Sequence, residues 1–239
     1  MSAMALYARA TPGHDHRLED SLALLRHAAR EHRGTIVQAT SLGAVDMVIT
    51  DLFARHRLPV AVATLETGAL HAETLALANR IEQHYGIEVE RWSPRPEAVV
   101  HFVRDHGTDA MYRSLALRKA CCGVRKLEPL QGLRREQSDA RADVPVATID
   151  AEGRAKLNVL ADWSWADVWH YIATHQVPYN VLHDQFFPSI GCQPCTRAIA
   201  VGEDFRAGRW WWEQSSRECG LHVAPSGNTP AVDDNATSN

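Results

Sequence analysis

The chain has 239 residues, of which 45% are hydrophobic and 23% charged, a composition typical of a soluble globular protein that can bury one large core. The net charge of −4 argues against a general nucleic-acid-binding protein, and no apolar run approaches the length of a membrane span, so we expect neither nucleic acid nor membrane as a partner. Five cysteines without a signal-peptide pattern favour a reducing compartment and a cytoplasmic location.

The first part of the chain alternates between helical patterns, short apolar segments and polar turns. Residues 1–16 show no period and predict a mobile tail, and a helical pattern follows over residues 18–32. Strands are predicted over residues 35–39, 59–65 and 87–92, and helices over residues 47–56 and 71–85. This alternation predicts parallel βαβ units in a doubly wound, mainly parallel α/β sheet, with a core over about residues 34–92.

Helical patterns dominate the second part of the chain. Helices are predicted over residues 96–106, 109–130 and 163–174, a short strand over 146–149, and a loop over 178–188. We therefore expect one domain over residues 17–222, with a helical, cysteine-bearing part at about 108–222. Residues 223–239 are rich in Ser, Asn, Asp, Pro and Gly and predict a second disordered tail.

The turn from Ser41 to Asp46 follows a predicted strand and opens a helix. In a parallel sheet such a turn lies at the carboxyl ends of the strands, where ligands bind, and its N–H groups could hold a phosphate or a sulfate. An ordinary βα turn would have a similar sequence, so this motif is weak by itself. It lacks the Gly-Lys-Ser/Thr ending of a Walker-type nucleotide loop.

Four of the five cysteines form two close pairs, Cys121-Cys122 and Cys192-x-x-Cys195. Two pairs of thiols in a reducing compartment indicate a closed tetrathiolate metal site or an iron–sulfur site, rather than buried small hydrophobic residues. Zinc is the main alternative. Adjacent cysteines on one helix point about 100° apart, which suits a cubane cluster better than one tetrahedral ion.

The fifth cysteine, Cys219, lies close to Arg217 and His222. Basic neighbours favour a reactive thiolate, and the alternative is an unused thiol in a loose segment. Arginines also cluster locally, although the net charge is negative, and such clusters suit a small anionic ligand. They are Arg134, Arg135 and Arg141, and then Arg197, Arg206 and Arg209.

Taken together, these motifs resemble the sulfonucleotide reductases of assimilatory sulfate reduction, and most closely their iron–sulfur branch, the adenylyl-sulfate (APS) reductases. The cysteine pairs and the Glu-Cys-Gly-Leu-His ending are specific, whereas the Ser-x-Gly loop is not. The fold that this resemblance implies is the adenine-nucleotide alpha-hydrolase-like fold. The segments that carry it are residues 41–44, 64–68, 119–126, 132–138, 189–196, 208–213 and 218–222.

The resemblance implies a 4Fe–4S cluster as cofactor, with Cys219 as the nucleophile. A thiosulfonate on Cys219 would be cleaved to sulfite by thioredoxin or a glutaredoxin-like reductant. The implied cluster ligands are Cys121, Cys122, Cys192 and Cys195. The implied substrate-binding residues are Ser41 and Gly43 at the phosphosulfate, Thr64, Leu65 and Gly132 at the adenosine, Lys126, Arg141, Arg206 and Arg209 at the anionic groups, and His222.

The chain departs from the family's pattern at Gln131, the one residue between Leu130 and Gly132, where the family has an apolar strand. We therefore expect a sheet strand to be missing there. Val45 also stands where the family often has an acid, and Val159 where it often has Pro.

Several alternatives to the APS reductase interpretation stay open. The nearest is a 3′-phospho-APS (PAPS) reductase of the same family. An ATP-dependent thiolating enzyme with a PP-loop would require a fuller Ser-Gly-Gly-x-Asp-Ser loop and a basic RNA surface, which the chain lacks. A zinc-stabilised binding module would leave Cys219 without a role. A homo-oligomer is compatible with the sequence, which does not determine the oligomeric state.

Overall fold

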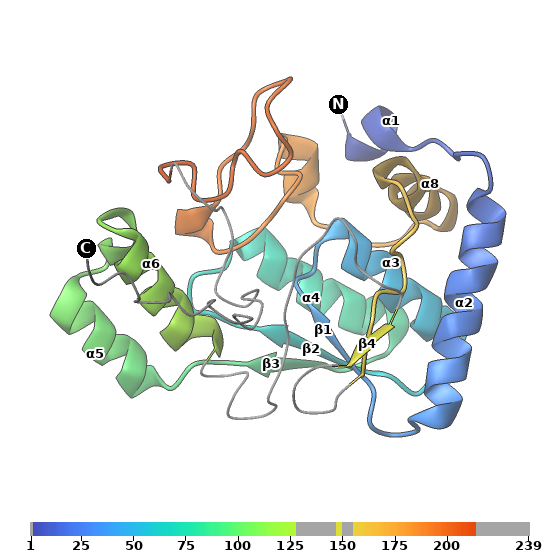
Figure 1. The fold of residues 1–239 in the computed structure, drawn as a ribbon, viewed down its shortest axis with the longest axis horizontal. Coiled ribbons are helices and arrows are strands. Elements are labelled where there is room, and N and C mark those ends of the chain that lie inside the picture. Colours follow the sequence, from blue (N-terminus) through green and yellow to red (C-terminus); the bar gives the residue numbers. More distant parts are fainter. Residues whose placement is uncertain (1, 128–146, 150–154, 214–239) are drawn as a thin grey trace, which may run out of the picture.

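The computed structural model describes residues 2–127, 147–149 and 155–213. Three parallel strands form the central sheet in the order β1-β2-β3, as Figure 1 shows. They are β1 (Val37–Thr40), β2 (Ala61–Leu65) and β3 (Val89–Trp92). Each predicted strand is therefore found within a few residues of its expected place, and the predicted α/β class with a parallel sheet is confirmed.

Helices that connect and flank the strands build the main core on one face of this sheet. Val62 and Val89 point from the sheet into a cluster with apolar residues of α3 and α4, and α2 and α8 extend this cluster. The parallel pairing requires such crossovers, because each strand must return to the same end of the sheet. The four helices are α2 (His14–Glu31), α3 (Ala44–Arg55), α4 (Ala72–Tyr85) and α8 (Trp165–His175).

The N-terminal segment corrects the prediction of a mobile tail over residues 1–16. Helix α1 (Ala3–Tyr7) packs on α8, where the Tyr7 ring lies 6.1 Å from the ring of Trp165, and α2 already begins at His14. The Ala3 N–H donates to Asp184 Oδ1 at 2.7 Å. Five helical residues are too few to show a period, and these contacts come from distant parts of the chain.

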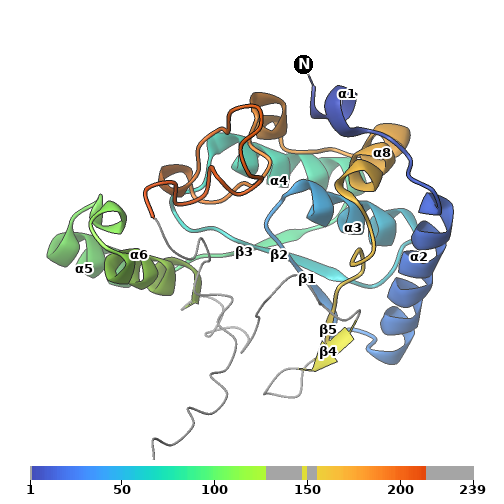
Figure 2. The same cartoon turned by 45° about the horizontal axis from the view of Figure 1, so that its top comes forward.

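A long helix is predicted over residues 109–130, and the part of it that the structure describes, to Leu127, is divided into three pieces. After α5 (Pro96–His106), a 3₁₀ turn η1 (Ala110–Tyr112) precedes α6 (Leu115–Cys122). Ser114 is the N-cap of α6, because its hydroxyl accepts a hydrogen bond from the backbone N–H of Leu117. The π-helical turn η2 (Gly123–Leu127) follows α6. Figures 1 and 2 both place α5 and α6 side by side, at the end of the molecule opposite α2.

The predicted strand over residues 146–149 is found as β4 (Ala147–Ile149), but it does not join the central sheet. It pairs antiparallel with β5 (Ala155–Leu157), as the second view shows (Figure 2). Helix α8 is followed by two 3₁₀ turns. The first is η3 (Val181–Gln185), which lies inside the predicted loop, and the second is η4 (Gln193–Cys195).

Among the helices that are described, none is both long and apolar enough to cross a membrane.

Several sequence predictions fall outside the described residues. They concern Gly132, Arg141, Cys219 and His222, the departure at Gln131, and the tail over residues 223–239.

Candidate functional site

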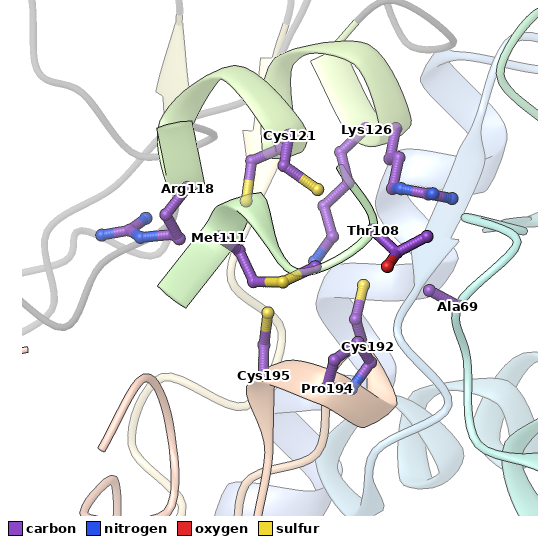
Figure 3. A pocket seen from close by; sticks show the side chains of 11 residues that line it. Ala69, Thr108, Met111, Arg118, Cys121, Lys126, Cys192, Pro194 and Cys195 are labelled. Carbon is purple, nitrogen blue, oxygen red and sulfur yellow. The ribbon is translucent and has the colours of Figure 1, made fainter. Parts of the chain in front are cut away.

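The two cysteine pairs, about seventy residues apart in sequence, line one cavity. Cys121 and Cys122 end helix α6, and Cys192 and Cys195 flank the η4 turn on the opposite side, as Figure 3 shows for three of the four. Each cysteine is 7% exposed. The cavity is also lined by Ala69, Thr108, Met111, Arg118, Arg125, Lys126 and Pro194.

Basic side chains of α6 and η2 lie next to the first cysteine pair. Burial raises the pKa of the Cys121 thiol, while a hydrogen bond and the positive charge of Arg125 oppose this shift. Arg118, one helical turn before Cys122, interacts with the Cys122 thiol. The π-helical turn carries both Arg125 and Lys126 to the cavity, so cations are in place to compensate thiolates there.

The second pair lies on the opposite wall of the cavity, as buried as the first. Burial, and then the neighbouring Cys192, raise the pKa of the Cys195 thiol to about 12. Thr67 Oγ1 lies 3.3 Å from Cys192 Sγ. A bound group that takes a thiolate from Cys195 would therefore have to release its proton, as metals do when they bind cysteine.

The four cysteines line one cavity, and three of their thiols can be followed in the close view. Among the described residues, no three His, Cys, Asp or Glu side chains converge closely enough to hold a single metal ion. The sulfur atoms of Cys121, Cys192 and Cys195 instead point into the cavity from opposite walls (Figure 3). This arrangement of soft, buried donors with cations beside them suits an iron–sulfur cluster.

The turn after β2 contacts both cysteine segments. The Thr67 carbonyl accepts a hydrogen bond from Arg125 Nη1 at 2.6 Å, while the Thr67 hydroxyl contacts Cys192. Two residues after Thr67, the Ala69 carbonyl accepts a hydrogen bond from the backbone N–H of Gln193 at 2.7 Å. This turn therefore joins the carboxyl end of the central strand to both walls of the cavity.

The predicted anion-binding loop lies at the carboxyl end of β1. Both the N–H and the hydroxyl of Ser41 donate to Asp46 Oδ2 at 2.7 Å, and Gly43 is the N-cap of α3. Burial raises the pKa of Asp46 above its usual value, although the hydrogen bonds from Ser41 oppose this. On β2, Thr64 Oγ1 donates to the Thr40 carbonyl at 2.9 Å, and Leu65 follows at the strand end.

Of the predicted anion-binding arginines, Arg209 is buried and held in a defined place. Its Nη1 donates to Ser189 Oγ at 3.3 Å and to the Ile190 carbonyl at 3.1 Å. A side chain on Gly191 would bring its Cβ within 2.4 Å of this guanidinium, so the close approach requires glycine. Arg206 lies in the turn before it, half-buried, with its backbone N–H bonded to Asp204.

Sequence analysis gave no individual role to Arg118, Arg125 or Thr67, although Arg125 and Thr67 lie in the segments 119–126 and 64–68 that carry the family resemblance. Arg118 is fully buried and forms an ion pair with Glu213, Nε to Oε1 at 2.8 Å. Arg118 and Arg125 stand one helical turn from a cysteine on either side, and that spacing is the signal that could have found them. Thr67 and Glu213 also lie in such segments, 64–68 and 208–213, but no local sequence signal predicts the contacts that they make.

Comparison with known proteins gives consistent matches over most of the chain. The family described as the phosphoadenosine phosphosulfate reductase domain matches residues 35–198. The adenosine 5′-phosphosulfate reductase of Allochromatium vinosum is 52% identical over 215 residues, 84% of each chain. The Burkholderia cepacia protein of the same name is 45% identical over 234 residues, 92% of this chain and 93% of its own.

A solved structure supports the fold. The crystal structure of phosphoadenylyl-sulfate (PAPS) reductase from Candida auris, in a phosphate complex, has a TM-score of 0.62 with this chain. At 24% sequence identity it covers 78% of this chain and 97% of its own. At that identity the match supports the architecture alone.

Proposed function

The chain belongs to the phosphoadenosine phosphosulfate reductase family, and we propose that it is an adenylyl-sulfate reductase, which converts adenylyl sulfate to sulfite and AMP. The observation that carries this proposal is the gathering of Cys121, Cys122, Cys192 and Cys195 around one cavity. That cavity is joined by the Thr67 turn to the carboxyl end of β2, next to the Ser41 loop on β1.

We propose that these four cysteines hold a 4Fe–4S cluster. Their thiols are buried, they face one cavity, and Arg118, Arg125 and Lys126 line it with positive charge. Such a cluster would supply a fixed cross-link between the two cysteine segments, together with thiolate charge that these cations compensate.

The substrate would lie across the carboxyl ends of β1 and β2. In this proposal Ser41 and Gly43 contact the phosphosulfate, and Thr64 and Leu65 contact the adenosine. Arg209 and Arg206 would neutralise the anion together with Lys126. A thiolate that attacks a sulfate group approaches an anion, so cations around the reacting atoms lower the barrier.

Cys219 is the proposed nucleophile. Its thiolate attacks the sulfur atom of the sulfate group and forms a sulfur–sulfur bond. The bond from that sulfur to the bridging phosphate oxygen breaks, and its electron pair leaves with AMP. A thiolate of a dithiol reductant such as thioredoxin then attacks Cys219 Sγ and expels sulfite. The second thiol closes the disulfide and returns the Cys219 thiolate.

A single-turnover experiment tests this function. Anaerobically purified protein with adenylyl sulfate and no reductant is expected to release about one AMP per active site and to carry one sulfonate on Cys219. Cys219→Ser should form no sulfite while it keeps the brown absorbance and binds AMP normally. A sulfonate on any other cysteine, or turnover by the serine variant, would contradict the mechanism.

Further measurements on the same anaerobically purified protein distinguish the alternative functions. Comparable kcat/KM for adenylyl sulfate and its 3′-phosphorylated form would make it a reductase of both nucleotides. Stoichiometric zinc instead of about four irons would support a zinc-stabilised module. AMP formation from ATP in the presence of tRNA would indicate a thiolating enzyme. The thioredoxin partner, the cytoplasmic location and a homo-oligomeric state remain predictions.

A further inference from the structure

Arg118 lines the cysteine cavity with positive charge, but none of the reaction steps described above involves it. Its side chain is completely inaccessible to solvent, and it lies on α6 one helical turn before Cys122. Burying a guanidinium is costly unless its hydrogen bonds and its charge are satisfied. This residue therefore needs a specific partner.

That partner is Glu213, which is 95 residues further along the chain. The pair is bidentate, with Nε to Oε1 and Nη2 to Oε2 both at 2.8 Å, and the Glu213 side chain is 8% exposed. A two-point contact between planar groups fixes orientation as well as distance. Glu213 is therefore held in place relative to the cysteine helix.

The ring of Trp210 completes this connection. The guanidinium carbons of Arg118 and Arg209 lie 4.4 Å and 4.7 Å from its centroid, so both cations contact one indole. The backbone N–H of Trp210 also donates to the Cys195 carbonyl at 3.2 Å. The segment that carries Trp210 and Glu213 is thereby tied to both walls of the cysteine cavity.

Glu213 is six positions before Cys219, the proposed nucleophile. We infer that Arg118 is a positioning residue, which fixes Glu213 and so sets the point from which the chain runs to Cys219. This inference rests on the proposed function, because it concerns how the Cys219 thiolate reaches the substrate. Arg118 itself touches neither the substrate nor the reacting atoms.

The test is Glu213→Gln, which keeps the shape of the side chain and removes its charge. A nitroxide on Cys219, the one cysteine outside the two pairs, reports the mobility of that residue by electron paramagnetic resonance. In unlabelled protein, AMP release from adenylyl sulfate without reductant reports the attack. We expect a mobile label, AMP release slowed about tenfold or more, unchanged brown absorbance and a nearly unchanged Kd for AMP.

The matched control is Glu82→Gln. Glu82 also forms a bidentate pair, with Arg91 at 3.0 Å and 2.9 Å, but on the surface between α4 and β3. The same chemical change there should leave label mobility and AMP release as in the parent protein. The comparison separates the anchor from a general effect of losing an ion pair.

Each outcome decides the inference. Unchanged label mobility and AMP release in Glu213→Gln, or a label that is already fully mobile in the parent, would overturn it. If Glu213→Gln loses the brown absorbance, the paired variant Arg118→Gln/Glu213→Gln decides, because removing both charges leaves no buried charge alone. If the double variant keeps the brown absorbance, has a mobile label and releases AMP slowly, the positioning role of Arg118 is supported. If the double variant also loses the absorbance, the ion pair has a purely structural role and the positioning inference is rejected. A parent protein that forms no AMP refutes the proposed function, while the label still tests the anchor.

Discussion

His183 shows what burial does to a titratable residue in this protein. It lies in η3, with its ring 5.3 Å from Trp169 and 6.0 Å from Trp165, and it is 5% exposed. Burial lowers its pKa to about 4, so the imidazole is neutral at physiological pH. In the unfolded chain the same side chain titrates near its ordinary value of about 6.5.

This difference predicts a loss of stability in weak acid. Below about pH 6.5 the unfolded chain binds a proton that folded His183 does not accept until about pH 4, so the free energy of unfolding falls as the pH falls. Between pH 7 and pH 5 the contribution is about 2 kcal/mol. His183→Phe should flatten this dependence in urea titrations, whereas His16→Gln, at an exposed site, should not. Equal slopes for parent and His183→Phe would show that His183 is protonated in the fold.

Single residues also mark how far the sequence could predict the site. The four cysteines were recognisable because close pairs of one rare residue type need no knowledge of the fold. The roles of Thr67 and Glu213 were not recognisable, because they depend on contacts with Cys192 and Arg118, 125 and 95 residues away. Whether Ser41, Thr64 and Arg209 bind a nucleotide stays a prediction.

At the scale of elements, the N-terminal segment is fastened to helix α8 through Asp167. This carboxylate forms a capping box with Ser164 and also accepts the N–H and hydroxyl of Thr11 and Nη2 of Arg17. Burial would raise the pKa of Asp167, but the hydrogen bonds from Ser164 and Thr11 outweigh it and lower the pKa below its usual value. One side chain therefore caps α8 and holds the start of α2.

Asp167→Asn should loosen this junction. The amide cannot accept all these hydrogen bonds, and Arg17 would lose its counter-ion, so we expect the free energy of unfolding to fall by about 2–4 kcal/mol. Asp105→Asn changes an exposed pair with Arg104 in the same chemical way and should lower the free energy of unfolding far less, because water screens this pair. Urea denaturation of both variants gives the comparison. Similar decreases in the free energy of unfolding for the two variants would show that the Asp167 contacts stabilise the protein no more than an exposed ion pair does.

The elements that sequence predicted well are those whose signal is local. Strands β1 to β3 and helices α3, α4 and α5 have apolar runs or helical periods bounded by turn residues, and all were found within a few positions. Helix α1 has only five residues and depends on Tyr7 packing against α8. The division of the 109–130 helix depends on Ser114 and on a π turn, which apolar periodicity does not reveal.

At the scale of the whole molecule, the described residues form cores of unequal size. The large core joins one face of the sheet to α2, α3, α4 and α8. The second contains Met111 and Trp210 with three cysteines, and it holds the α6 segment against the η4 segment. So small an apolar cluster contributes little by itself, and a group bound by the thiols would supply most of this cohesion.

Removing the proposed iron–sulfur cluster should therefore affect one part of the molecule. After treatment with a chelator under anaerobic conditions, amide hydrogen exchange should rise in residues 110–127 and 189–212 but stay slow in β1, β2 and β3. Cys195→Ser, purified without chelator, should give the same pattern. Equal loss of protection in the sheet would mean that the two cores unfold together, and no change would mean that the site adds no stability.

The Thr67 turn has a thermodynamic consequence. It continues the strand that carries Thr64, and it contacts both Arg125 and Cys192 across the cavity. A nucleotide at the strand ends and a metal group in the cavity would share this backbone. Any preference of one ligand for a particular placement of the turn must reappear, as an equal factor, in the affinity of the other. Tighter retention of iron with nucleotide bound, and tighter binding of nucleotide with iron present, would then be one quantity measured from two sides.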